Sequence, residues 1–241
     1  MPRGTSLPQS LRCILDGFSD CFTAPTFKVF SALVVGFIAR PASRTVCGML
    51  TGAGLARFWH HARAHRFFAV ARWSAREVGL ALAALLVRHL LGPDEPILLA
   101  VDETLFRRRG PKVHAIGWWH DGSAAGRKVG LGNSWVVAAI IVRLPFLTRP
   151  VALPVLAALC TKPGPSKPAL ARELTDALTQ HFPTRTIHLV ADAAYGCGAF
   201  AAIGPRITMT TRAPHAQADA VGSAGGEAPQ AAVRLGPASR P

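Results

Sequence analysis

Two apolar runs that each lead into an acid constrain the fold of this 241-residue chain more than any other feature. In "ILLAVDET" residues 97–101 run into Asp102, and in "IHLVADAAY" residues 187–190 lead to Asp192. Short continuous apolar runs of this kind are typical of strands buried on both faces of a sheet. Sites in open α/β sheets form at the carboxyl ends of strands, so Asp102 and Asp192 are expected to converge if the two strands are neighbours.

Two carboxylates in one cleft repel each other, and a shared proton or a bound cation relieves that repulsion. Mg²⁺ takes oxygen ligands and keeps several waters, which leaves positions for phosphate. Two such ions clamp both the attacking and the leaving oxygen of a phosphoryl transfer. The structural alternative is that Asp102 forms a buried ion pair with Arg107 or Arg108 and that Asp192 caps a following helix. The spacing alone leaves both interpretations open.

The hydrophobic pattern changes from helical to strand-like at Pro96. Upstream, the clearest helix is "SAREVGLALAALLVRHLLGP", in which Ser74 and Glu77 have the spacing of a capping box. Downstream, "KVHAIGWWHDGS", "NSWVVAAIIVRLPF" and "RITMTTR" indicate further strands, and "SKPALARELTDALTQHF" indicates an amphipathic helix. We therefore predict an N-terminal helical region over residues 1–95 and an α/β domain over residues 96–212.

The charge of the chain favours a polyanionic partner. Lys and Arg number 27 against 13 Asp and Glu, which gives a formal net charge of +14. No acid occurs between Asp20 and Glu77, a stretch that holds Lys28, Arg40, Arg44, Arg57, Arg63, Arg66, Arg72 and Arg76. Aromatic residues interleave with these bases, which suits contact with a DNA backbone. A solvated basic face over an aromatic core explains the same pattern equally well.

Several other classes of site are disfavoured by the sequence. Five cysteines without a C-x-x-C pair predict neither a disulfide framework nor a structural zinc site. His61 and His65 have the spacing of zinc ligands on one helix face, but no acid or cysteine lies near them in sequence, so packing or phosphate contact is favoured. No apolar run approaches the roughly 20 residues of a membrane span. We expect a cytoplasmic, nucleoid-associated protein that does not contact membranes.

The segments "LLAVDETLFRRRGPKVHAIGWWHDGS", "GNSWVVAAIIVRLPFLTRPVALPVL" and "IHLVADAAYG" resemble the catalytic core of DDE-type transposases of bacterial insertion sequences. More narrowly, they resemble the DDE superfamily endonucleases of high-GC actinobacteria. The resemblance covers about residues 22–212 and includes "RTVCGMLTGAGLARFWHHARAHRFF". It implies a ribonuclease-H-like domain, in which a mixed sheet with flanking helices carries one acid after its first strand and another after its fourth.

The resemblance also implies roles for individual residues. Asp102 and Asp192 correspond to the first two catalytic, metal-binding aspartates, and Glu103 stands where many relatives carry a second aspartate before threonine. An intact relative uses two Mg²⁺ or Mn²⁺ ions, binds duplex DNA at transposon ends and target, and can form a homo-oligomer. The basic residues expected to contact DNA are Arg107, Arg108, Arg109 and Lys112 near the cut, and Arg57, Arg63 and Arg66 in the helical region.

The third acid of the family is a glutamate beyond the strand that matches "RITMTTR", and its counterpart here is unknown. The chain changes character at Ala213: of the last 29 residues 17 are Ala, Gly or Pro, so residues 213–241 are predicted to be disordered. Glu227 in "GGEAP" is a poor candidate for the missing ligand. A frameshift or early stop would produce this pattern. We expect a truncated, inactive transposase remnant; the alternatives are a non-catalytic protein that occupies transposon ends and inhibits an intact copy, and a nuclease that works with two acids.

Overall fold

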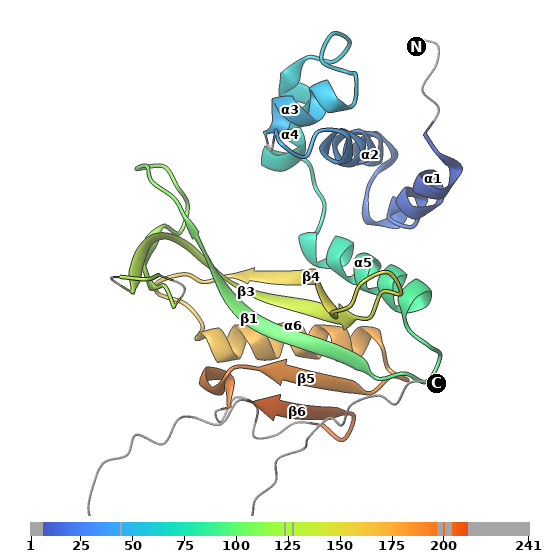
Figure 1. Ribbon diagram of the computed structural model, residues 1–241. Helices are drawn as coiled ribbons and strands as arrows, with labels where there is room; N and C mark the ends of the chain where they lie inside the picture. Colours follow the sequence, from blue (N-terminus) through green and yellow to red (C-terminus); the bar gives the residue numbers. More distant parts are fainter. Residues whose placement is uncertain are drawn as a thin grey trace, which may run out of the picture.

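The structure is a computed structural model that describes residues 7–43, 45–122, 124–126, 128–196, 200 and 204–211. Within these residues the chain forms an N-terminal group of helices followed by a mixed six-stranded sheet with two long helices (Figure 1). The predicted tail over residues 213–241, including Glu227, lies outside the described residues. No helix in the described ranges is both long and apolar enough to cross a membrane.

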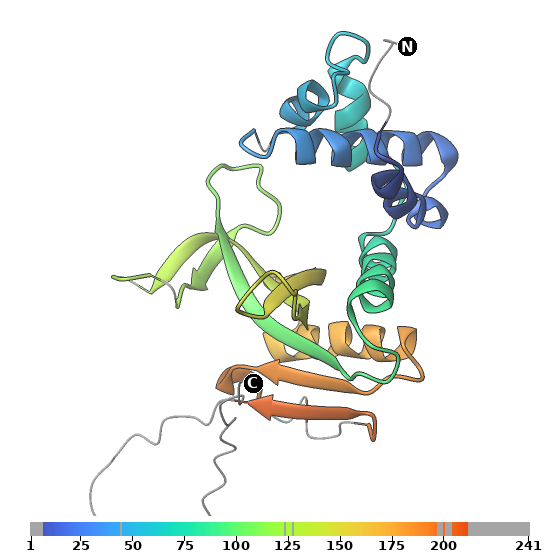
Figure 2. The ribbon, with the colours of Figure 1, turned by 45° about the vertical axis from the view of Figure 1, so that its right-hand side comes forward.

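Four helices form the N-terminal group: α1 (Gln9–Asp16), α2 (Ala24–Ala39), α3 (Val46–Gly52) and α4 (His61–Ala69), with a 3₁₀ turn, η1 (Ser19–Cys21), after α1. Helices α2, α3 and α4 share a core of Val29, Leu33, Leu50, Ala64 and Phe67. Helices α2 and α3 cross so closely that a Cβ on Gly36 would lie 1.8 Å from the Met49 carbonyl oxygen. Figure 2 shows this group beyond one end of the next helix, away from the sheet.

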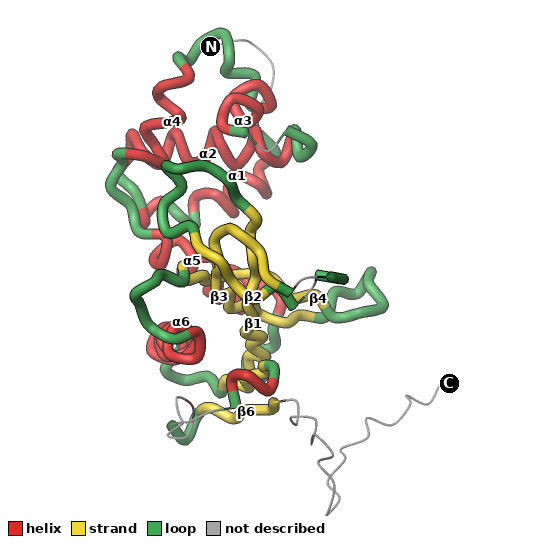
Figure 3. The backbone as a smooth tube through the Cα atoms, turned by 90° about the vertical axis from the view of Figure 1, so that its left-hand side faces the viewer, coloured by secondary structure: helices red, strands yellow, loops and turns green. Residues whose placement is uncertain are grey.

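Two long helices pack into the core of the sheet. Helix α5 (Ala75–Leu90) begins at Ser74, whose Oγ accepts a hydrogen bond from the Glu77 amide at 3.2 Å, as the capping box predicted. Helix α6 (Lys167–His181) begins at Ser166, whose Oγ caps the Ala169 amide. An ion pair of 3.2 Å between Arg76 and Glu173 joins the two helices. Figure 3 shows α6 along one side of the strands.

The sheet has the order β2-β3-β1-β5-β6, and β4 pairs with β3 beside it. Its strands are β1 (Ile97–Arg107), β2 (Gly117–His120), β3 (Val129–Val142), β4 (Val151–Leu159), β5 (Ile187–Ala191) and β6 (Ile207–Thr211). Strands β1, β5 and β6 run parallel, whereas β3 is antiparallel to β1, β2 and β4. The predicted fold class is therefore confirmed: a mixed α/β sheet of ribonuclease-H-like type, preceded by helices.

Strand β4 is the element that the sequence pattern did not identify. Its sequence "VALPVLAAL" contains Pro154, which lacks a backbone donor and argues against a central strand. The structure places Pro154 opposite Ala139, next to a register shift between Ala138 and Ala139, on a strand that pairs on one side with β3. A proline is tolerated at such a position because its neighbour does not need the missing N–H.

The prediction that β1 and β5 are buried on both faces was wrong. Ile97, Leu99 and Val101 face the core, as do Ile187, Leu189 and Ala191. Leu98 and Val190 alternate with them and are 36% and 38% exposed. Apolar residues on both faces of these strands therefore do not mean that both faces are covered, because α5 and α6 share the core on one side only.

Candidate active site

The two aspartates predicted to converge lie at matching positions of neighbouring strands. The parallel register of β1 and β5 pairs Val101 with Ala191, and Asp102 and Asp192 follow these residues directly. Adjacent strands are about 4.8 Å apart, and side chains at equivalent positions point to the same face. Both aspartates are exposed and line one pocket. The prediction that the two strands are neighbours is confirmed.

The hydrogen bonds of these aspartates bear on the two interpretations of the sequence, a cation site or an ion pair with a helix cap, and support a part of each. Asp102 Oδ1 accepts from the Glu103 amide, and Asp192 Oδ1 accepts from the Ala193 amide, each at 2.7 Å. Asp192 therefore does cap the short 3₁₀ helix η2 (Ala193–Tyr195). Within the described ranges no Lys or Arg forms an ion pair with either aspartate. Each carboxylate thus has a second oxygen available to a ligand.

Arg107 pairs with Asp121 rather than with Asp102. Its Nη2 donates to Asp121 Oδ2 at 2.7 Å and its Nε donates to the same oxygen at 3.2 Å. The Asp121 side chain is 7% exposed and that of Arg107 is 66% exposed, so the arginine neutralises a buried acid from the surface. The alternative in which Arg107 or Arg108 neutralises Asp102 is not what the structure shows.

Glu103 is neutralised by a residue that the sequence did not point to. It forms an ion pair with Lys167, the first residue of α6. Residues 102 and 103 alternate along β1, so Glu103 points to the face opposite Asp102. Both nevertheless line the same pocket. The reason is that β5 ends at Ala191 whereas β1 continues to Arg107, so the pocket wraps around a strand edge.

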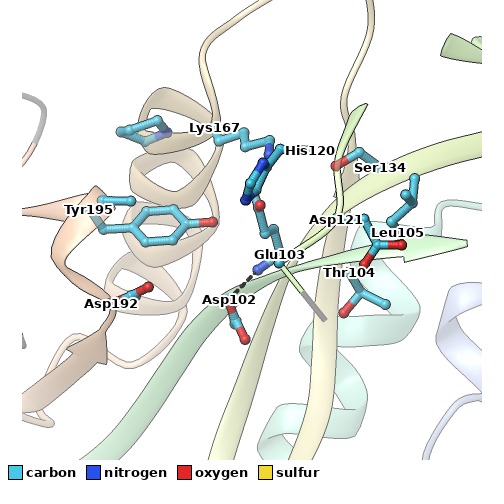
Figure 4. A pocket seen from close by; sticks show the side chains of 13 residues that line it. Asp102, Glu103, Thr104, Leu105, His120, Asp121, Ser134, Lys167, Asp192 and Tyr195 are labelled. Atoms are coloured by element: carbon cyan, nitrogen blue, oxygen red, sulfur yellow. Dashed lines mark hydrogen bonds and ion pairs between the residues drawn. The ribbon is translucent and has the colours of Figure 1, made fainter. Parts of the chain in front are cut away.

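The pocket has a volume of about 660 Å³ and a mixed lining of acids, bases and neutral polar groups (Figure 4). It is lined by Asp102, Glu103, Thr104, Leu105, His120, Asp121, Gly122, Ser134, Lys167, Pro168, Asp192, Ala194 and Tyr195. The sequence reasoning missed Lys167, His120, Ser134 and Tyr195. Only Tyr195 carried a local signal, since it lies three residues after Asp192; the others come together through tertiary packing.

Tyr195 contributes a buried hydroxyl to this pocket. The residue is 3% exposed, and its hydroxyl oxygen has no hydrogen-bond partner among the described residues. It points into the pocket, toward the side where Glu103 lies (Figure 4). Burial raises the pKa of the phenol, and the charges of Glu103 and Asp102 raise it further. Tyr195 therefore remains a neutral hydrogen-bond donor beside three carboxylates.

The family model of the DDE superfamily endonucleases matches residues 17–216, which include both aspartates and every strand of the sheet. The chain belongs to this family. Membership implies a DNA substrate, and enzymes of this superfamily generally use divalent metal ions. Comparisons with curated proteins and with solved structures gave no match.

The donor set of this DDE superfamily endonuclease suits one hard cation better than a closed metal site. Asp102 and Asp192 supply carboxylate oxygens side by side, which are the ligands that Mg²⁺ prefers. Among the described residues no three His, Cys, Asp or Glu side chains come together as a metal site. The ring centroids of His61 and His65 lie 5.9 Å apart, and His65 Nε2 lies 3.9 Å from Cys47 Sγ, without a further ligand.

The basic residues expected to contact DNA lie on two surfaces. Arg107, Arg108 and Arg109 line a second hollow next to Trp118 and Val129, and Lys112 is exposed in the loop that follows. On the helical group Arg57 is exposed, and Arg63 and Arg66 line a shallow hollow on α2 and α4. The Arg63 guanidinium lies over the Trp59 ring at 4.4 Å. Their roles in DNA binding remain predictions.

Proposed function

We propose that this DDE superfamily endonuclease is a transposase of the bacterial insertion-sequence type. Such an enzyme cuts DNA at transposon ends and joins the freed 3′ hydroxyl to target DNA. The observation that carries the proposal is the parallel register of β1 and β5, which sets Asp102 and Asp192 side by side, each directly after the last paired residue of the two strands. Both face a pocket large enough for a phosphodiester group and open to solvent.

Asp102 and Asp192 are the residues that would hold the divalent cation, Mg²⁺ or Mn²⁺. When bound, the cation supplies charge neutralisation at the phosphate undergoing transfer. The remaining work falls to residues of this chain. Arg108, Arg109 and Lys112 are exposed and contact phosphates near the cut, and the paired Arg107 holds the same loop in place through Asp121. The helical region over residues 1–95 binds transposon ends through Arg57, Arg63 and Arg66.

We further propose that this copy does not complete transposition. Within the described residues no three carboxylates are grouped as a metal site, and Glu103, which lines the same pocket as Asp102 and Asp192, is paired with Lys167. The sequence after β6 contains Asp219 and Glu227, and Glu227 stands in "GGEAP", where glycine and proline disfavour a helix. Because the helical region is basic and Arg57, Arg63 and Arg66 are exposed, the second candidate is a non-catalytic protein that occupies transposon ends.

The test is strand cleavage of a DNA duplex that contains the transposon end, in Mg²⁺, by the purified 241-residue chain. We expect DNA binding with little or no cleavage, and cleavage by a chain extended with the family's C-terminal region. Asp102→Ala in the extended chain should abolish cleavage and leave binding intact. Efficient cleavage by the 241-residue chain, lost in Asp102→Ala, would contradict inactivity. An out-of-frame match to the family's glutamate region in the downstream nucleotide sequence would independently support the remnant.

A further inference from the structure

The ion pair between Glu103 and Lys167 bears directly on the missing third carboxylate. Glu103 is the acid adjacent to Asp102 and lines the same pocket as Asp102 and Asp192. Its carboxylate is held by the Lys167 ammonium at the first turn of α6. The positive end of a helix also favours a carboxylate at this position. In this arrangement Glu103 contacts an internal cation and is kept away from the two aspartates.

The geometry of the strand edge gives Glu103 access to the aspartates. In a strand paired on both sides, neighbouring residues face opposite surfaces and cannot share a ligand. Strand β1 loses its parallel partner after Val101, where β5 ends. Beyond that point the pocket is continuous around the edge, and Asp102 and Glu103 both border it. A long glutamate side chain released from Lys167 can therefore turn around the edge toward Asp102.

Tyr195 is a second, independent indication that the pocket has another arrangement. Its hydroxyl is buried and without a partner in the Lys167-bound arrangement, and it points toward the side where Glu103 lies (Figure 4). An unsatisfied buried donor costs free energy, and native structures rarely retain one without a function. A Glu103 carboxylate that leaves Lys167 supplies the acceptor that this hydroxyl lacks.

We propose that Glu103 is the third carboxylate of the cation site and that Lys167 occupies it as an internal counter-ion. The inference rests on the proposed function, because it takes Asp102 and Asp192 as the first two ligands. Lys167 and a divalent cation compete for the same carboxylate, so the lysine weakens cation binding. Removing the ammonium frees Glu103, and adding a carboxylate ligand tightens a hard-cation site.

The experiment is a titration of the full-length chain with Mn²⁺, followed by calorimetry and by the electron paramagnetic resonance signal of free Mn²⁺. Lys167→Met keeps the aliphatic stem and removes the charge. We expect it to bind Mn²⁺ about tenfold more tightly than the unmodified chain, because Glu103 then adds a third carboxylate charge to the cation site. Lys167→Met combined with Glu103→Gln should lose that gain. Lys167→Arg keeps the ion pair and should bind as the unmodified chain does.

Three controls make the result decisive. Lys28→Met removes the same charge from the exposed surface of α2, so an equal gain there would show a general electrostatic effect and overturn the proposal. A gain that persists without Glu103, or no gain in Lys167→Met, would overturn it as well. Asp102→Asn tests the underlying site: if that variant binds Mn²⁺ as well as the unmodified chain, the proposed function fails instead. Circular dichroism of each variant checks that it is folded.

Discussion

At the scale of single residues, the pocket combines carboxylates that have different kinds of partner. Asp102 and Asp192 accept only backbone amides, Glu103 is paired with Lys167, and Asp121 is paired with Arg107. The two aspartates without an ion pair follow directly after the point where the parallel pairing of β1 and β5 ends. Asp102 and Asp192 are therefore the acids whose charge an external cation would neutralise. Glu103 and Asp121 are already neutralised by Lys167 and Arg107.

Tyr195→Phe removes a buried hydroxyl that has no partner. Leaving such a group unsatisfied costs about 1–3 kcal/mol, so its removal should leave the free energy of unfolding unchanged or raise it by up to about 1 kcal/mol. Urea denaturation followed by circular dichroism measures this directly. A loss of more than about 1 kcal/mol would show that the hydroxyl has a partner in solution.

Arg107→Ala should destabilise the fold modestly because it leaves the nearly buried Asp121 carboxylate without its ion pair. Since Arg107 is largely exposed, solvent screening limits the loss to about 1 kcal/mol. Arg108→Ala is the matched control, because its guanidinium makes no ion pair with a described residue. Equal melting temperatures for the two variants would contradict the importance of the Arg107–Asp121 pair.

At the scale of elements, the sequence predicted what depends on local pattern. The apolar runs before Asp102 and Asp192 form strands β1 and β5, and the Ser74–Glu77 capping box lies at the start of α5, as the sequence predicted. The sequence could not predict β4, because Pro154 is untypical of a strand. It also could not predict the pairing of Glu103 with Lys167. That pairing is made by the docking of α6 on the sheet, and no spacing in the chain encodes it.

The crossing of α2 and α3 depends on a glycine. In Gly36→Ala the new Cβ would overlap the Met49 carbonyl, so the helices must separate. Overpacking of this kind costs about 1–3 kcal/mol or more, and the melting temperature of the chain should fall. Gly126→Ala is the control, since nothing lies within 4 Å of a Cβ at that position. A Gly36→Ala chain as stable as the control would disprove the tight crossing.

At the scale of the whole molecule, we expect the net charge of +14 to favour binding to DNA. Helix α5 links the basic helical group to the sheet and shares the core of the sheet. Basic residues on the helical group and on the loop after β1 are therefore joined through α5 and the loop that precedes it (Figure 1). The division at residue 95 into a DNA-binding region and a catalytic domain remains a prediction.

We expect duplex DNA binding to weaken steeply as salt rises, because each phosphate contact releases a counterion. Fluorescence anisotropy of a labelled duplex between low and physiological salt gives the slope of log affinity against log salt. Replacing both Arg63 and Arg66 by Ala should lower the slope by about 2 if each contacts one phosphate. An affinity that hardly changes with salt would contradict a phosphate-based interface.

The central claim, that Asp102 and Asp192 form one cation site, is tested most directly by iron-directed cleavage of the protein chain. Fe²⁺ substitutes for the divalent cation, and ascorbate with peroxide then generates radicals that cut the backbone next to the bound ion. The account predicts two cuts, near residues 102 and 192, both suppressed by excess Mg²⁺ and both lost in Asp102→Asn. Cuts near only one of these positions, or only around His61 and His65, would contradict it.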